Sequence, residues 1–167
     1  NYGVGVIIVA NKWDLVPEKD SHEVERYVEY YGKIFPHLSF APIAFVSAKT
    51  KQRVTKLLDL ALEVEAEREK TIAPKALERL LVSSIKKHPP TRGGGSVARL
   101  GKKTRHPFIY SIEQKGVKPP RFAITISPQT NLNETYVRFI EKQLREEFDF
   151  EGTPIHMTVV KKKFADS

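Results

Sequence analysis

The sequence predicts an α/β part, with a parallel sheet of two βα units, over residues 1–70, followed by an α+β part with the order α-β-β-α-β over residues 71–167. Three observations support this division. Two short apolar runs in the first part are each followed by apolar residues at helical spacing. The second part instead combines strand-like runs with amphipathic helices. Its charge also differs, because residues 71–167 hold 18 Lys and Arg against 9 Asp and Glu, whereas residues 1–70 hold 10 against 11.

The first strand is predicted over residues 4–10, where every position is apolar or glycine. A run without alternation suits a strand that is covered on both faces, as in a parallel sheet between helices. A second apolar strand is predicted over residues 41–48. Two strands are too few for an independent sheet of this kind, and Asn1 is not an initiator residue. We therefore expect most of this domain to lie upstream.

Each of these strands is followed by an amphipathic helix. The first helix, over residues 23–35, is predicted to bury the face that carries Val24, Tyr27, Val28, Tyr31 and Phe35. The second helix is predicted to bury Val54, Leu57, Leu58, Ala61, Leu62 and Val64. Strand–helix repeats predict parallel strands joined by right-handed crossovers.

The second part begins with a helix that runs from about Pro74 to the Pro89-Pro90 pair, which cannot continue a helix. Its buried face is predicted to carry Leu77, Leu80, Leu81 and Ile85. Residues 91–107 are rich in Gly, Arg and Lys and predict a loop, here called the basic loop. Strands are predicted over 108–115, 121–128 and 155–160, with a helix after the N-cap Asn133. This order predicts a three-stranded sheet with helices on one face.

The composition excludes several classes of site. The chain has no cysteine, which excludes disulfides and thiolate metal sites and suits a reducing, cytoplasmic compartment. No apolar run approaches the roughly 20 residues that a membrane-spanning helix needs, so no membrane partner is expected. The five histidines lack metal-ligand spacing, and we assign no metal ligand and no catalytic residue to this chain.

Polar residues follow the first strand directly, in the order Asn11-Lys12-Trp13-Asp14. This matches the N-K-x-D motif of GTP-binding proteins. Guanine presents two adjacent donors, N1–H and the exocyclic amine, and the carboxylate of Asp14 can accept from both. Adenine has an acceptor at N1 and would leave that carboxylate unpaired. Asn11 would hold the loop and meet the base edge, while the aliphatic stem of Lys12 lies across the ring.

A second motif, Ser47-Ala48-Lys49, ends the next strand. S-A-K at this position is the fifth sequence motif of the same superfamily, in which the backbone N–H of Ala48 would donate to guanine O6 and Lys49 would cover the opposite ring face. Taken alone, Ser47 could be a helix N-cap and Lys49 a solvated surface lysine. Both motifs at the ends of consecutive strands favour a guanine site built from Asn11, Lys12, Asp14, Ser47, Ala48 and Lys49.

The sequence contains no phosphate-binding loop of the form G-x-x-x-x-G-K-[ST]. The nearest stretch, from Gly95 to Lys103, has one residue too many between its glycines, and Lys103 stands where Ser or Thr must reach magnesium. The chain alone is therefore expected to be inactive in GTP hydrolysis.

The basic loop predicts a different partner. Between Lys86 and Arg121 the chain holds ten Lys and Arg and one acid, Glu113, which suits contact with an RNA backbone rather than DNA. The residues assigned to this contact are Arg92, Arg99, Lys102, Lys103, Arg105, Lys118 and Arg121. The nearby aromatic residues Phe108, Tyr110 and Phe122 are more simply interpreted as core residues of the sheet.

Taken together, these features resemble the end of the Der (EngA) GTPases, a bacterial-type family with two GTPase domains in tandem and a C-terminal KH-like domain. The resemblance rests further on Pro119-Pro120-Arg121-Phe122, on the helical segment 136–146 and on Phe150-Glu151-Gly152-Thr153-Pro154-Ile155. It covers nearly all 167 residues. It implies that residues 1–70 are the C-terminal portion of a P-loop-GTPase-type domain and that residues 71–167 form a KH-like domain.

The resemblance also implies a function for the parent protein, which would hydrolyse GTP to GDP with Mg²⁺ and act in assembly of the large ribosomal subunit. Its partners would be guanine nucleotide, ribosomal RNA and the upstream GTPase domains of the same chain. The family's basic loop is usually shorter than residues 91–107. Like the family, this sequence lacks the G-x-x-G loop by which other KH domains clamp a nucleotide backbone.

A second hypothesis stays open at the level of sequence. Residues 71–167 could act as a stand-alone basic RNA- or ribosome-binding adaptor without nucleotide hydrolysis. A phosphate-binding loop upstream would favour the GTPase hypothesis, and a start codon near Asn1 would favour the adaptor. We prefer the GTPase, because a two-strand remnant would expose apolar faces to solvent.

Overall fold

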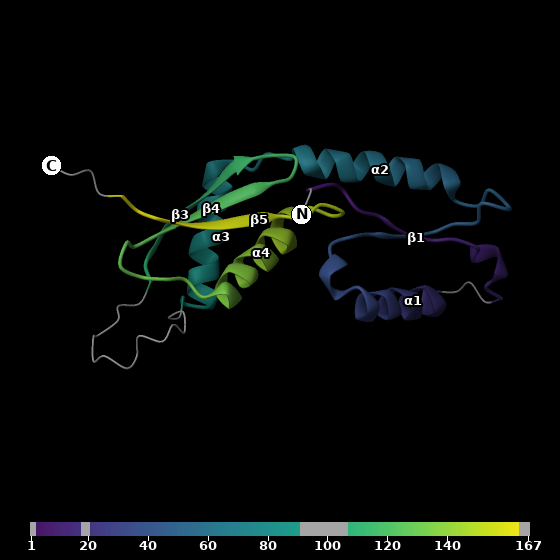
Figure 1. Cartoon of the computed structure of the whole chain (residues 1–167), viewed down its shortest axis with the longest axis horizontal. Coiled ribbons are helices and arrows are strands. Elements are labelled where there is room, and N and C mark those ends of the chain that lie inside the picture. The colour runs from purple at the N-terminus through teal and green to yellow at the C-terminus, as the bar shows by residue number, and fades with distance from the viewer. Residues whose placement is uncertain (1–2, 18–20, 91–106, 164–167) are drawn as a thin grey trace. The chain divides into compact units, whose positions relative to one another are not determined.

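The computed structural model describes residues 3–17, 21–90 and 107–163 of the 167 in the chain. The chain divides into two compact units, the first formed by Asn1–Lys70 with Phe150–Pro154 and the second by Thr71–Asp149 with Ile155–Ser167. Figure 1 shows the elements of each unit in chain order. The sequence places residues 150–154 in the second part, whereas in the structure they pack with the first unit.

The first unit holds two βα units, as the sequence predicts. Strand β1 (Ile8–Ala10) precedes helix α1 (Ser21–Ile34), and strand β2 (Ile43–Phe45) precedes helix α2 (Val54–Glu69). The two strands pair in parallel, with Ile8 opposite Ile43 and Ala10 opposite Phe45. Short 3-10 turns lie between them, η1 (Trp13–Leu15) and η2 (Pro36–Leu38). Both strands are shorter than the apolar runs that contain them.

The core of this unit lies between α1 and the sheet. Ala10, Trp13 and Phe45 are buried together, and Val24, Tyr27 and Tyr31 of α1 pack against them. The helical spacing in residues 23–35 therefore identifies the inner face of α1 correctly for these three side chains. Val28 and Phe35, which were expected on the same face, are 46% and 36% exposed.

The prediction for α2 is wrong for much of its apolar face. Val64 is buried, but Leu58 and Leu62 are 65% and 71% exposed, and Val54 is also exposed. These three residues lie four positions apart and form one stripe along the helix. The first strand is not covered on both faces either, since Val4 and Val9 are exposed. The reason is that no element among the described residues packs against these side chains.

The segment Phe150–Pro154 is held in the first unit by main-chain hydrogen bonds. Gly152 donates its N–H to the carbonyl of Phe40 and accepts from the N–H of Val6, both at 2.7 Å. The N–H of Phe150 donates to Glu67 Oε2 at 2.8 Å, and the ring of Phe150 is fully buried. The motif that supported the family resemblance thus has a structural role in the first unit.

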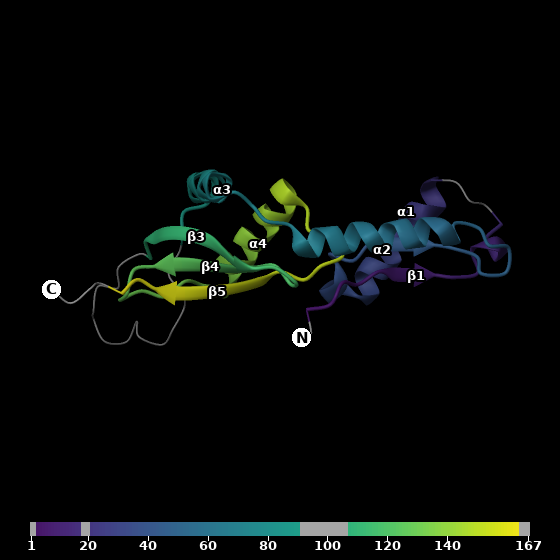
Figure 2. The same ribbon diagram turned by 90° about the horizontal axis from the view of Figure 1, so that it is seen from above.

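The second unit has the predicted order α-β-β-α-β. It consists of α3 (Pro74–Lys87), β3 (Ile109–Gly116), β4 (Arg121–Ile126), α4 (Glu134–Phe148) and β5 (His156–Lys161). Strand β4 is central, antiparallel to β3 and parallel to β5. Both helices lie on the same face of the sheet, as Figure 2 shows. Among residues 71–90, 107–149 and 155–163, no helix covers the opposite face.

The helices of the second unit begin and end as the sequence indicates. Pro74 opens α3, and Asn133 caps α4 by accepting the N–H of Thr135 at 3.0 Å. The inner face of the sheet carries Phe122, Ile124 and Ile126, which are buried against the helices. The helices contribute their own buried residues, among them Leu77, Leu80, Leu81, Ile140 and Leu144.

Tyr136 links α4 to the end of α3, since its hydroxyl donates to the carbonyl of His88 at 2.8 Å. Tyr136→Phe should lower the free energy of unfolding by about 1 kcal/mol, the usual net contribution of one hydrogen bond. Urea unfolding followed by circular dichroism would measure this change. Tyr110→Phe is the matched control, since the exposed Tyr110 should contribute less than about 0.5 kcal/mol.

Burial also raises the pKa of Tyr136 above its ordinary value. Because the folded state then holds the proton more tightly than the unfolded state, Tyr136 stabilises the fold fully below the unfolded-state pKa of about 10. That contribution should be lost as the pH rises above this value. The loss should be smaller in Tyr136→Phe, and identical pH dependence in both proteins would contradict this assignment.

Candidate functional site

The chain turns sharply where β1 ends, and the turn carries the first predicted motif. Lys12 has a left-handed backbone conformation, with φ of 64°, which is uncommon for a residue with a side chain. Its N–H donates to Asn11 Oδ1 at 2.7 Å. The side chain of Asn11 therefore supports the turn, and η1 then places Asp14 beside the end of β2.

Trp13, the variable position of the motif, anchors this turn. Its side chain is 2% exposed, and its ring centroid lies 4.5 Å from that of Phe45 and 5.4 Å from that of Tyr27. Its backbone N–H donates to the carbonyl of Val46 at 3.0 Å. Lys12 and Asp14 are thus fixed by a buried ring between them. No role for Trp13 was predicted from the sequence, although a large aromatic residue inside a polar loop is a signal of such an anchor.

The second motif joins the first through side-chain hydrogen bonds. Ser47, which is fully buried, donates through Oγ to Asp14 Oδ1 at 2.5 Å. The N–H of Ala48 donates to Asn11 Oδ1 at 3.1 Å. Ser47 Oγ also accepts the N–H of Thr50, so it caps the following turn as well as orienting Asp14. The structure therefore brings Asn11, Asp14, Ser47 and Ala48 together at the carboxyl ends of β1 and β2.

This cluster, here called the β1–β2 site, is open to solvent. Asn11, Lys12, Ala48 and Lys49 are exposed, whereas Asp14 is partly buried. Asn11 uses its side-chain oxygen to hold the two backbone N–H groups, and its amide nitrogen takes part in neither bond. The N–H of Ala48, which was predicted to donate to guanine O6, here donates to Asn11. The site therefore presents the carboxylate of Asp14, which Ser47 holds in place, and the amide nitrogen of Asn11 as a donor. Lys12 and Lys49 are neighbours of these residues in the chain.

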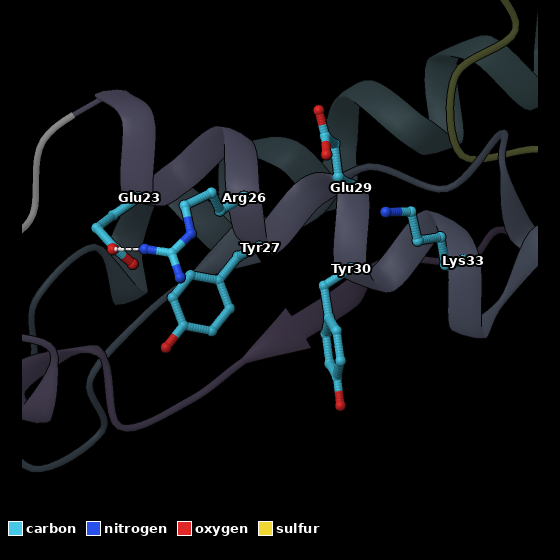
Figure 3. A pocket seen from close by; sticks show the side chains of 6 residues that line it. All are labelled: Glu23, Arg26, Tyr27, Glu29, Tyr30 and Lys33. Carbon is cyan, nitrogen blue, oxygen red and sulfur yellow. Dashed lines mark hydrogen bonds and ion pairs between the residues drawn. The ribbon is translucent and has the colours of Figure 1, made fainter.

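A separate hollow of about 550 Å³ lies along the outside of α1 and is shown in Figure 3. It is lined by Glu23, Arg26, Tyr27, Glu29, Tyr30 and Lys33. Tyr27 and Tyr30 point to the same side of the helix, and Arg26 is paired with Glu23. None of these residues belongs to the two motifs. All of its lining residues in the described part of the chain belong to α1, and we assign the hollow no ligand.

Five of the seven predicted RNA-contact residues, Arg92, Arg99, Lys102, Lys103 and Arg105, lie outside the described residues. The other two are exposed, Lys118 between β3 and β4 and Arg121 at the start of β4. The guanidinium of Arg121 lies close to Gly116, where an added Cβ would be 2.6 Å from Nη2.

The aromatic residues near the basic loop were predicted to be core residues of the sheet, which is correct for one of them and wrong for two. Phe122 is fully buried, but Phe108 and Tyr110 are 61% and 39% exposed. The two rings flank Ile109, which is buried in the core, and the strand register shifts between Ile109 and Ser111. The sequence alone did not separate these two rings from Phe122, and their exposure is a finding of the structure.

Residues 3–17, 21–90 and 107–163 contain neither a metal-binding cluster nor a membrane-spanning helix. In these ranges no group of three or more His, Cys, Asp or Glu side chains could hold a metal ion. Nor does any helix in them combine the length and the apolar composition that crossing a membrane requires.

Two comparisons relate this chain to known proteins. Residues 72–159 match the family described as the KH-domain-like of EngA bacterial GTPase enzymes, C-terminal. The chain is 40% identical over 161 residues to GTPase Der of Streptococcus uberis, an alignment that covers 96% of this chain and 35% of the relative. GTPase Der of Ligilactobacillus salivarius is 39% identical and that of Streptococcus thermophilus 37% identical, with the same coverage. The chain thus spans about a third of the length of the curated relatives that it matches.

Proposed function

Because the chain belongs to the Der (EngA) family of GTPases, we propose that its first unit is the guanine-recognising portion of a GTPase domain. In this proposal the β1–β2 site binds the base of GTP or GDP. The observation that supports it most directly is the pair of hydrogen bonds that join Asp14 to Ser47 and Asn11 to Ala48. These bonds fix two motifs from different strands into one site.

Guanine specificity follows from the fixed carboxylate of Asp14. It accepts from guanine N1–H and from the exocyclic amine, while the amide nitrogen of Asn11 donates to an acceptor on the base edge. The stems of Lys12 and Lys49 cover the two ring faces. Adenine would place an acceptor against the carboxylate, and the unpaired charge would reject it. For guanine O6 to receive the N–H of Ala48, that N–H must be shared with Asn11 or released from it.

In this proposal, GTP is hydrolysed by a longer parent protein that includes these 167 residues. The 167 residues contain no phosphate-binding loop, so we assign no catalytic residue and no Mg²⁺ ligand to them. We propose that the phosphates and Mg²⁺ are bound upstream, in the part of the GTPase that the curated relatives have in addition. That upstream part would also cover the exposed stripe of Val54, Leu58 and Leu62 on α2.

The second unit, in this proposal, is a KH-like domain that docks on ribosomal RNA during assembly of the large ribosomal subunit in the cytoplasm. Its charge supports this role, since residues 71–167 carry twice as many Lys and Arg as Asp and Glu. Packing against upstream GTPase domains is the other role that we propose for it.

Guanine recognition can be tested on this chain with one substitution that exchanges specificity. GDP should bind weakly, with a dissociation constant no better than about 1 mM or −4 kcal/mol, because base contacts alone are available. Amide chemical shifts of Asn11, Asp14 and Ala48 should move on titration with GDP and not with ADP. Asp14→Asn should abolish the GDP response and create a response to xanthosine diphosphate. Xanthine has an N1–H donor beside a carbonyl acceptor, and the side-chain amide that the substitution introduces can accept from the first and donate to the second.

Asp59→Asn on the exposed surface of α2 is the matched control and should leave the GDP response unchanged. Equal responses to GDP and ADP would contradict the proposal, as would unchanged GDP binding in Asp14→Asn. Micromolar binding of GDP would contradict the assignment of the phosphate site to the upstream part.

A further inference from the structure

We propose that the open face of the β3–β4–β5 sheet binds single-stranded RNA, with Phe108 stacking on a base and Lys162 contacting a phosphate. The inference rests on the proposed docking of the second unit on RNA and specifies the surface and the form of RNA. It differs from a KH groove, because the sequence has no G-x-x-G loop. The helices α3 and α4 cover the other face of the sheet, so this is the face that no helix covers in the described part of the unit (Figure 2).

The two exposed rings form a fixed pair rather than isolated side chains. The centroids of Phe108 and Tyr110 lie 4.8 Å apart with the rings at 72°. Phe108 is anchored through its backbone, whose N–H donates to Ser127 Oγ and whose carbonyl accepts the N–H of Ser127. The more exposed ring, Phe108, is thus presented on a rigid backbone. Such a ring suits an unpaired base, which has an apolar face of similar size.

Lys162 lies beside this pair, with Nζ 4.1 Å from the centre of the Tyr110 ring. The N–H of Lys162 also donates to the carbonyl of Ile126, which fixes its backbone at the end of β4. Tyr110 on β3 and Lys162 after β5 therefore meet across the end of the central strand. A cation held against an aromatic face at this place can meet the phosphate next to a base stacked on Phe108.

The charge of the sheet favours a polyanion over a protein with an apolar patch. In residues 107–128 and 155–163 there are six Lys and Arg and a single acid, Glu113, which is paired with Lys115. The cations lie at both ends of the strands: Lys161, Lys162 and Lys163 at one end, and Lys115, Lys118 and Arg121 at the other. Strand β4, six residues long, separates them by about 17 Å, which several nucleotides can span.

Small neutral side chains lie between the two groups of cations. Ala123 stands opposite Glu113 and Thr158 in the register, and Thr125 stands opposite Ser111 and Val160. Cross-strand partners share a face of the sheet, so Ala123, Thr125, Ser111 and Thr158 lie on the face away from the helices, where Ala123 is 4% exposed and Thr158 is exposed. The face therefore combines the exposed ring pair of Phe108 and Tyr110 with positive charge at both ends of the strands.

Fluorescence anisotropy of the 167-residue chain with a labelled uridine RNA of about ten nucleotides tests this surface. We expect Phe108→Ala to weaken binding by about tenfold to hundredfold, the effect of losing one stacked base. Phe108→Trp, which keeps the aromatic face, should retain the affinity within about threefold. Val82→Ala, which removes an equally exposed apolar residue from α3, is the matched control and should bind like the unaltered chain.

The salt dependence separates the role of Lys162 from that of Phe108. Lys162→Ala should lower the slope of log K against log salt by about 0.7, because one phosphate contact is lost. Phe108→Ala should leave the slope unchanged, and so should Lys142→Ala on α4, where Lys142 is paired with Glu146. Circular dichroism of each variant checks that the fold is retained.

Two further probes of the same length, a thymidine DNA and an RNA duplex, serve as comparisons. Four results would overturn the inference. If the chain preferred an RNA duplex, RNA docking would stand but would not take place on this face. If Phe108→Ala bound with full affinity, RNA docking would again take place elsewhere, and the ring of Phe108 would be assigned to a contact with a protein. Equal binding of the thymidine DNA would exclude selection for RNA. No binding of either RNA would contradict the docking proposal as well, while the guanine site is tested independently by the GDP titration.

Discussion

Trp13→Ala is expected to destabilise the first unit by about 3–5 kcal/mol, the usual result of removing a buried large aromatic side chain. The ring is 2% exposed and packs between Phe45 and Tyr27, so its removal leaves a cavity in the small core beneath the β1–β2 site. Because Lys12 and Asp14 flank it, the variant should also lose the GDP response. The measurement is urea unfolding by circular dichroism, since Trp13 is the single tryptophan and fluorescence would be lost with it.

Two controls distinguish a loss of packing from a loss of chemistry. Trp13→Phe should cost less than half as much, because the buried Nε1 of Trp13 has no hydrogen-bond partner among the described residues and only ring volume is lost. Leu15→Ala, in the same 3-10 turn but 70% exposed, should change the stability by less than about 0.5 kcal/mol. A loss below about 1 kcal/mol in Trp13→Ala would show that the ring does not anchor the turn.

Gly152→Ala should have the second large effect, a loss of about 2–4 kcal/mol from the first unit. Gly152 has φ of +71°, a conformation that an alanine adopts only with strain. An added Cβ would also overlap Val64 Cγ2 and lie 2.8 Å from Val64 Cγ1. The backbone cannot move away easily, since hydrogen bonds to Phe40 and Val6 hold it on both sides.

Backbone strain at Gly152 and overlap with Val64 can be separated by chemical unfolding of the double variant Gly152→Ala, Val64→Ala. Val64→Ala should relieve the overlap but not the backbone strain, so the two substitutions together should cost less than the sum of their separate losses. Gly32→Ala is the matched control, because nothing lies within 4 Å of its added Cβ. In helix α1 it should raise the stability by about 0.5–1 kcal/mol. Additive losses at Gly152 and Val64 would contradict the predicted contact.

The sequence predicted an element correctly where the interactions that define it join residues close together in the chain. Asn133 accepts an N–H two residues later in the chain, and Pro74 opens α3, so neither position depends on distant residues. The order α-β-β-α-β and the parallel pair in the first unit also follow from hydrophobic periodicity. The motif at the end of each strand was placed at one edge of the sheet because parallel strands end on the same side.

The bonds inside the site were beyond the reach of sequence alone. Ser47 and Asp14 are 33 positions apart, and Ala48 and Asn11 are 37 apart. Spacing indicates that both motifs serve one ligand, but it does not show that Ser47 orients the carboxylate or that Ala48 donates to Asn11. These bonds depend on the register of β1 against β2, which only the folded pair defines.

The sequence by itself determined the order of the helices and strands in both units, the two motifs of the β1–β2 site and the excess of positive charge in residues 71–167. Tertiary structure alone decided that Leu58 and Leu62 are exposed while Val64 is buried, that Phe150–Pro154 packs with the first unit, and that Phe108 faces solvent. The physical reason is that periodicity defines the apolar face of an element but not what covers it. Burial depends on contacts between residues far apart in the chain, such as Val6 with Gly152.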